Sequence, residues 1–206
     1  MRFHNGAVPE DPAFQPEEQG WKPIREPGVW GMQLMAIPVA FLLVLISAGL
    51  IWPALPDGFF TSGFHFDLPL WKLALTLIVI IPVHEFIHAL CSPGWGCTRR
   101  TVIGMWLSRG LFYAHYEGEM SRNRFLFVFA GPYLVLALLP IPAVAILGAL
   151  NPGSGAIWPL AFLSLLAGTL SSGDAIGFFL VLMQIPADAL VRNKGWRTYW
   201  RPPDAA

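Results

Sequence analysis

The chain has 206 residues, of which 55% are hydrophobic and only 13% are charged, and its formal net charge is zero. This charge content excludes an ordinary soluble domain, in which about 25% of residues are charged. A neutral chain also lacks the positive charge that nucleic-acid binding requires, so we expect no nucleic-acid partner. The composition indicates an integral membrane protein whose first partner is the lipid bilayer.

Residues 1–28 are polar and rich in proline, glutamate and glutamine. They lack the apolar stretch of a secretory signal peptide, so we expect no cleavable signal at this end. A segment of this composition buries little apolar surface when it folds. We therefore predict a loosely ordered cytoplasmic tail over residues 1–28.

Four apolar segments follow, at about 30–52, 68–91, 125–150 and 157–185. Each is long enough for the roughly 20-residue helix that crosses a bilayer. Between the second and third segments, alternating residues on either side of "SRG" predict a short β-hairpin. The predicted fold is thus all-α, with about four transmembrane helices in one membrane domain, residues 29–186, and one short hairpin.

The distribution of lysine and arginine predicts the orientation of these helices. Twelve of the thirteen basic residues lie before the first segment, between the second and third, or after the fourth, and Lys72 is the exception. Because cytoplasmic loops carry an excess of lysine and arginine, we expect both termini in the cytoplasm. This predicts a multi-pass protein of the plasma membrane with a basic cytoplasmic tail over residues 187–206.

The second apolar segment contains the sequence HEFIH, an HExxH pattern, at residues 84–88. On a helix, His84 and His88 share one face and could bind one zinc ion between them. Glu85 would then lie beside the metal, where it could take a proton from the attacking water. Ionisable groups are costly inside a bilayer and usually functional there, which favours a site over a chance match.

A catalytic zinc usually has three protein ligands, and the fourth apolar segment contains one acidic residue, Asp174. Asp174 lies about 26 Å along its predicted helix, and the two histidines lie about 24–30 Å along theirs, at 1.5 Å per residue. Both helices run in the same direction, so His84, His88 and Asp174 should lie at one depth. We predict these three residues as the metal ligands, with zinc as the metal, although another divalent ion is an open alternative.

Simpler interpretations of the same residues stay open at this point. The histidine pair could pack in a polar helix interface, and Asp174 could hydrogen-bond to Ser171 or Ser172. His115 and Asp188 are weaker candidates for the third ligand. The two cysteines are interpreted as free thiols, because two do not make a disulfide framework. The two cysteines are Cys91 and Cys97.

Together the HExxH sequence, Ala130-Gly131-Pro132 and Asp174 resemble the site-2 protease family of intramembrane zinc metalloproteases. The resemblance covers residues 68–186 and is closer to a smaller group of membrane proteins described as zincin peptidases. It implies a three-helix core, a strand-rich segment after the first core helix, and peptidase activity. The chain departs from the family in two motifs: no asparagine follows Ala130-Gly131-Pro132, and Asp174 lies in "SGDAIG" rather than "LDG".

The first functional hypothesis is a zinc-dependent intramembrane metallopeptidase that cleaves membrane-spanning or membrane-adjacent peptides, with Glu85 as the catalytic residue. The alternative is a metal-binding membrane protein without catalytic activity, or an inactive relative that acts as a scaffold or chaperone. A haem or quinone carrier is a third possibility, disfavoured because histidines four residues apart on a helix cannot occupy opposite faces of one haem. Nothing in the sequence indicates the oligomeric state.

Overall fold

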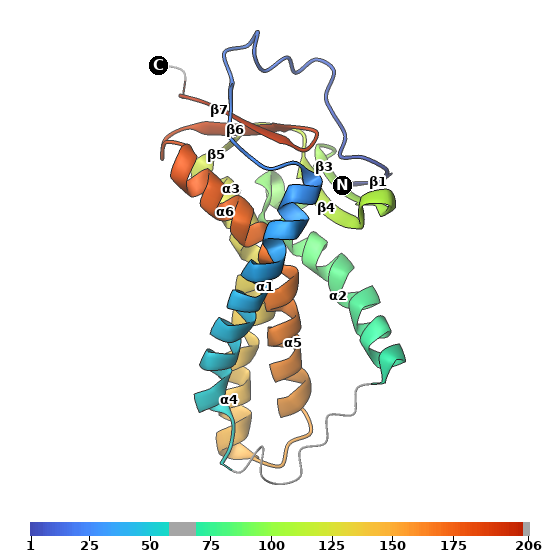
Figure 1. Ribbon diagram of the computed structural model, residues 1–206, viewed down its shortest axis with the longest axis vertical. Helices are drawn as coiled ribbons and strands as arrows, with labels where there is room; N and C mark the ends of the chain where they lie inside the picture. Colours follow the sequence, from blue (N-terminus) through green and yellow to red (C-terminus); the bar gives the residue numbers. More distant parts are fainter. Residues whose placement is uncertain (58–68, 204–206) are drawn as a thin grey trace.

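The computed structural model describes residues 1–57 and 69–203. Helices fill one end of the elongated molecule, and strands form a cap at the other end, where β1 and β7 lie near the two termini (Figure 1). The helices are α1 (Val29–Ile51), α2 (Leu70–Cys91), α3 (Arg122–Pro132), α4 (Pro140–Leu150), α5 (Ile157–Leu170) and α6 (Ser172–Gln184). The strands are β1 (Arg2–Asn5), β2 (Lys22–Pro23), β3 (Thr101–Trp106), β4 (Leu111–Tyr116), β5 (Met120–Ser121), β6 (Leu190–Lys194) and β7 (Arg197–Arg201).

The prediction of an all-α fold is wrong, because the seven strands form two β-sheets among the described residues. One sheet has the order β1-β3-β4, and the other has the order β2-β7-β6-β5. The strands are two to six residues long, and all except β3 and β4 lie in polar segments. Short polar strands contain no apolar pattern that would predict them, and only the β3–β4 hairpin was predicted.

The predicted hairpin is confirmed. Strands β3 and β4 pair in antiparallel register from Thr101 opposite Tyr116 to Trp106 opposite Leu111. The connection ends at Gly110, whose backbone is left-handed (φ +62°), a conformation that glycine adopts without steric cost. The hairpin directly follows α2, and so it begins next to the HExxH helix.

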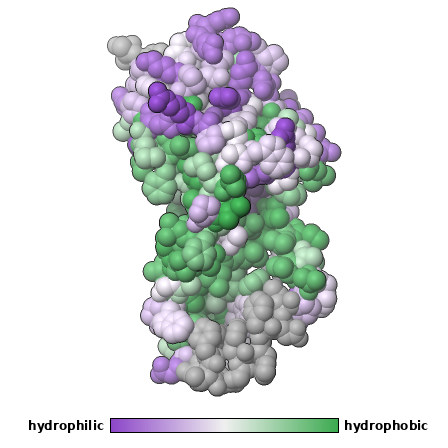
Figure 2. Space-filling model, viewed as in Figure 1, coloured by the Kyte–Doolittle hydropathy of each residue, from purple (hydrophilic) through white to green (hydrophobic). Residues whose placement is uncertain are grey.

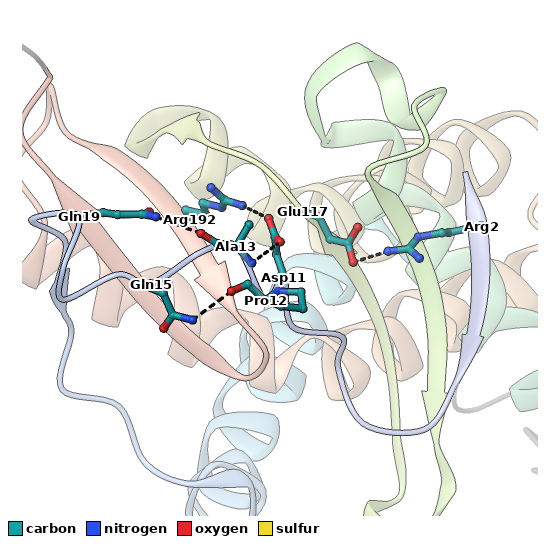
Figure 3. A network of polar contacts seen from close by, with 8 residues as sticks. All are labelled: Arg2, Asp11, Pro12, Ala13, Gln15, Gln19, Glu117 and Arg192. Atoms are coloured by element: carbon teal, nitrogen blue, oxygen red, sulfur yellow. Dashed lines mark hydrogen bonds and ion pairs between the residues drawn. The ribbon is translucent and has the colours of Figure 1, made fainter.

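The two predicted tails are parts of the cap, and the prediction that residues 1–28 are loosely ordered is wrong. Strand β1 lies parallel to β3, and β2 pairs with β7. Phe14 is almost completely buried, with its ring facing the guanidinium of Arg192 at 4.1 Å. Ion pairs join Arg192 to Asp11 (2.6 Å) and Arg2 to Glu117 (Figure 3). Aromatic burial and these ion pairs supply the stabilisation that the tail's low average hydrophobicity does not suggest.

Three helical stretches of the described chain are long and apolar enough to cross a membrane: Val29–Ala54, Leu70–Cys91 and Arg122–Leu150. Their outward side chains are mostly large and apolar, as expected for a surface that faces lipid. Figure 2 shows this hydrophobic surface along the helical part and a hydrophilic surface over the cap. These features are those of a membrane protein with a polar end outside the hydrocarbon layer.

The segment predicted as one span over residues 157–185 consists of two helices, α5 and α6, bent by 51° at their junction. Ser171 lies at the junction, with a backbone conformation outside the helical region. The break places Asp174 in the first turn of α6, where the partial positive charge of the helix N-terminus favours a carboxylate. The bend thus presents the one acidic side chain of this segment at the beginning of a new helix.

Helix α6 packs closely against α3 through Gly177, one turn after Asp174. A Cβ atom added to Gly177 would lie 2.6 Å from the Phe129 ring, whereas nothing lies within 4 Å of one added to Gly173. We therefore expect Gly177→Val to destabilise the protein by about 1–3 kcal/mol and to weaken metal binding, because α6 must move away from α3.

Gly173→Ala is the matched control, a neighbouring glycine on the same helix with open space around it. Thermal unfolding in detergent and zinc content per protein measure both effects. Equal unfolding temperature and zinc content in the two variants would contradict the role given to Gly177.

Candidate metal centre

Two histidines one helical turn apart form one side of the candidate site. His84 and His88 lie in the last two turns of α2, and their rings are 4.9 Å apart. Both are buried, with about 5% of each residue exposed. Position i and i+4 place them on one face of the helix, as the sequence predicts.

Asp174 on α6 forms the other side of the site. Its two carboxylate oxygens lie 2.9 Å from Nε2 of His84 and 3.1 Å from Nε2 of His88. One ligand atom from each of the three residues lies within 4.8 Å of the other two, so the three residues form a possible metal site. The structure thus brings together the three side chains that the sequence predicts as ligands.

The surroundings of His88 fit a bound cation. Its Nδ1 lies 2.7 Å from the backbone oxygen of Val128 on α3, and its Nε2 faces a carboxylate oxygen of Asp174. Both ring nitrogens therefore face acceptors, and a neutral imidazole has only one N–H to donate. Either the ring carries two protons, or the Nε2 lone pair binds a cation while Nδ1–H donates to Val128. The second arrangement is the usual one for a metal-binding histidine.

Glu85 lies between the metal site and strand β4. It is buried, with 8% of the residue exposed, and its carboxylate accepts a hydrogen bond from the backbone N–H of Ala114. His84 and His88 lie on one turn of α2 and face Asp174. Glu85 is the residue next to His84, and its side chain contacts β4 instead. This carboxylate can therefore act on a molecule held between the metal site and the strand.

Among the described residues, β4 is an edge strand, and one side of its backbone has no strand partner. The N–H of Glu117 donates to the carbonyl of Arg100, so the pair formed by these two residues is a hydrogen-bonded one. This identifies which pairs of the β3–β4 ladder exchange hydrogen bonds. Such pairs alternate along an antiparallel ladder, so Phe112, Ala114 and Tyr116 direct their backbone groups away from β3. The sheet order ends at β4. The open side of this strand is the side on which Ala114 meets Glu85.

A cavity of about 380 Å³ connects these elements. Its wall includes the two histidines and the glutamate of the HExxH motif, Asp174, residues 111–115 of β4, and residues of α1, α3 and the β6–β7 hairpin. It also includes Glu26, which precedes α1 and which belongs to no motif in the sequence. The cavity therefore extends from the candidate metal site to the polar cap, which provides a path for water and for a ligand.

Glu26 is held by the cap. Its carboxylate accepts a hydrogen bond from the backbone N–H of Thr198 (2.7 Å). Burial raises the pKa of Glu26 from 4.5 to about 7, although hydrogen bonds from Thr198 and the charge of Arg197 act in the opposite direction. The Glu26 carboxyl therefore holds its proton more tightly in the folded protein than in the unfolded chain. The free energy of unfolding falls as the pH rises from about 4.5 to 7, because the folded protein must then bury the charged form.

We therefore expect Glu26→Gln to be more stable than the wild type at pH 8, by up to about 3 kcal/mol, and to lose this advantage near pH 4.5. Glutamine keeps the acceptor for Thr198 but carries no charge. Thermal unfolding of both proteins in detergent across this pH range measures the effect. Parallel curves for the two proteins would contradict it, since every other titrating group is common to both.

The weaker ligand candidates lie apart from the three-residue cluster. His115 on β4 lines the cavity but does not join His84, His88 and Asp174 within the described chain. Burial lowers the pKa of His115 to about 4, and the charges of Arg2 and Arg192 contribute in the same direction, so this ring is neutral at pH 7. Asp188 is exposed in the loop after α6.

Two backbone groups of the site were not predicted from the sequence. The carbonyl of Val128 faces His88, and the N–H of Ala114 faces Glu85. Every residue carries such groups, so no side-chain pattern reveals them. Val128 lies two residues before Ala130-Gly131-Pro132 on α3, and that nearby motif was the available signal.

Residues 77–190 match a protein family described as "Putative zincin peptidase". This match covers more than half of the chain, including both histidines and Asp174. The chain belongs to this family. Zincins bind zinc through their HExxH histidines, so membership implies zinc as the metal of this possible site. No curated protein and no solved structure matches the chain significantly.

Proposed function

We propose that this family member is a zinc-dependent intramembrane peptidase of the site-2 protease type. One observation carries the proposal: the Asp174 carboxylate reaches both HExxH histidines, and the second of these rings faces an acceptor at each nitrogen. Two buried imidazoles and a partly buried carboxylate converge here, and a bound cation would satisfy all three. A neighbouring buried carboxylate, Glu85, then supplies the second requirement of a metallopeptidase.

In this proposal His84, His88 and Asp174 hold the zinc ion. The donor set of two imidazoles and one carboxylate is a usual one for catalytic zinc, and it leaves a position open for water or substrate. When bound, zinc makes water easier to deprotonate at neutral pH and polarises the peptide carbonyl. Val128 orients His88 through its carbonyl oxygen, which selects the ring nitrogen available to the metal.

Glu85 acts as the general base and then as the general acid. Its carboxylate takes one proton from the attacking water, and the resulting hydroxide adds to the carbonyl carbon of the peptide bond. The same group then returns the proton to the amine nitrogen as the C–N bond breaks. The position of Glu85 beside Ala114 supports this role, because a substrate along β4 would lie within its reach.

The edge of β4 is the proposed binding surface for the peptide. An extended segment could pair by strand addition with the outward backbone groups of Phe112 and Tyr116 and with the carbonyl of Ala114, whose N–H already donates to Glu85. A helical substrate hides its peptide bonds in its own hydrogen bonds, so pairing with β4 would also expose the bond to be cleaved. The cavity beside this strand gives the side chains of the substrate a place to bind.

The chain is proposed to cross the plasma membrane four times, with both termini and the β-sheet cap on the cytoplasmic side. The bent pair α5–α6 supplies the fourth crossing. The basic residues of the cap agree with the excess of lysine and arginine on cytoplasmic surfaces. The metal site lies near this end of the helices, where water can enter from the cytoplasm.

The direct test is metal removal and return. We expect purified protein in detergent to cleave a membrane-spanning model peptide, to lose activity after dialysis against a chelator, and to regain it when zinc is added at one equivalent. The readout is the mass of the cleavage products. A zinc-loaded, folded protein that cleaves none of a varied peptide library would instead support the non-catalytic alternative, a metal-binding scaffold.

A further inference from the structure

The cavity beside the candidate metal site has an acidic wall. Among its described lining residues are three carboxylates and three histidines, and none is lysine or arginine. Two of the carboxylates, Glu85 and Asp174, already have roles at the metal site. Glu26 has no such role, and it is the one charged group that the cap contributes to this wall.

Glu26 lacks a close cationic partner in the described structure. Its hydrogen bond comes from the neutral backbone of Thr198. Arg197 influences Glu26 electrostatically but is itself exposed and does not line the cavity. A half-buried carboxylate whose charge is only partly compensated is favourable for a positively charged ligand, because the ligand supplies the missing charge.

A second polar side chain of this wall belongs to the β6–β7 hairpin. Asn193 is the cross-strand partner of Thr198 in the β6–β7 hairpin, and its Oδ1 atom is buried without a hydrogen-bond partner among the described residues. Asn193 also lines the cavity. Glu26 and Asn193 approach Thr198 from opposite edges of β7, Glu26 at the backbone N–H and Asn193 as the partner residue on β6.

The hairpin turn adds an aromatic ring to the same wall. Lys194 pairs with Arg197, and the two residues between them are Gly195 and Trp196. Trp196 lines the cavity together with Glu26 and Asn193. An aromatic ring beside two oxygen acceptors is a usual environment for an ammonium or guanidinium group, because the face of the ring attracts cations.

We propose that Glu26, Asn193 and Trp196 form a recognition site for a cationic group of the peptide substrate. This inference rests on the proposed peptidase function and specifies its substrate: a peptide with a positive charge on the cytoplasmic side of the cleaved bond. Membrane-spanning segments carry an excess of lysine and arginine on that side, so many would present such a charge to the cap. The group is a lysine or arginine side chain, or a free terminal amine.

The test uses the full-length, zinc-loaded protein and three peptides with the same 20-residue apolar segment. The first peptide has a lysine directly after the segment and an acetylated N-terminus. The second replaces the lysine with acetyl-lysine, and the third replaces it with glutamine but leaves the N-terminal amine free. Binding is measured with fluorescent peptides on Glu85→Gln and on Glu85→Gln combined with Glu26→Gln. Cleavage is measured on the wild type and on Glu26→Gln.

We expect the lysine peptide to bind and to be cleaved at least ten-fold better than the acetyl-lysine peptide, and Glu26→Gln to remove this preference. Tight binding of the third peptide instead would identify a terminal amine as the recognised group. Glu18→Gln, an exposed carboxylate in the same N-terminal region, is the control and should keep the preference.

If Glu26→Gln lowers the affinity and cleavage of charged and neutral peptides equally, the proposal is overturned and Glu26 has a structural role only. Equal affinity of all three peptides for both proteins would also overturn it. Absence of cleavage by the wild type, with the lysine preference intact in binding, would contradict the peptidase function but not the cation site. The two ideas can therefore fail separately.

Discussion

Glu85→Gln is expected to keep the zinc content of the wild type and to lower kcat by about 10²–10⁴-fold, the usual contribution of a general base. Glutamine has nearly the same shape as glutamate and can still accept the hydrogen bond from Ala114, so the fold should not change. It cannot take a proton from water at neutral pH. The measurement is peptide cleavage beside zinc analysis of the same preparations.

Glu18→Gln provides the matched control, since it removes one carboxylate from an exposed position far from the motif in sequence. Its activity and zinc content should equal those of the wild type. Undiminished cleavage by Glu85→Gln would refute the general-base role. If neither the wild type nor Glu85→Gln cleaves any peptide while both bind zinc, the scaffold alternative becomes the better description.

Asp174→Ala is expected to lower the affinity for zinc by more than about 100-fold, because even a residue that only supports a ligand usually contributes 10–100-fold. The carboxylate of Asp174 is the group that both HExxH histidines face, at 2.9 and 3.1 Å. Its removal leaves two imidazoles, which are too few protein ligands for a usual zinc site. Zinc competition with a chromophoric chelator measures the affinity.

Asp188→Ala is the control for this experiment. Asp188 is the next acidic residue along the chain, and it is exposed in the loop before β6. Its removal should leave zinc affinity unchanged. Full zinc affinity in Asp174→Ala, with a loss in Asp188→Ala or His115→Ala, would show that the third ligand has been assigned to the wrong residue.

The three-residue cluster could be anticipated because lipid leaves few positions for ionisable side chains. His84, His88 and Asp174 are costly in apolar surroundings, and Asp174 is the one acidic residue of its apolar segment. The estimate of equal depth assumed an unbroken helix over residues 157–185. The structure has a 51° bend before Asp174 and still brings the carboxylate to the histidines.

The cap could not be anticipated in the same way. Strands β1, β2, β6 and β7 come from the two ends of the chain, and β2 pairs with β7 across almost the whole sequence. A two-residue strand has no periodicity to detect, and its stability depends on partners that only the fold brings near. The same holds for Phe14, which is buried in a segment whose composition is typical of disorder.

The sequence by itself determined the membrane character of the chain, the β3–β4 hairpin and the identity of the candidate metal-binding side chains. Each of these depends on local composition or spacing, since a bilayer selects long apolar helices and a helix places positions i and i+4 together. Only the tertiary structure decided the second sheet, the free edge of β4 beside Glu85, and the position of Glu26 in the cavity wall. These features depend on backbone groups and on contacts between distant segments, for which one-dimensional patterns carry no signal.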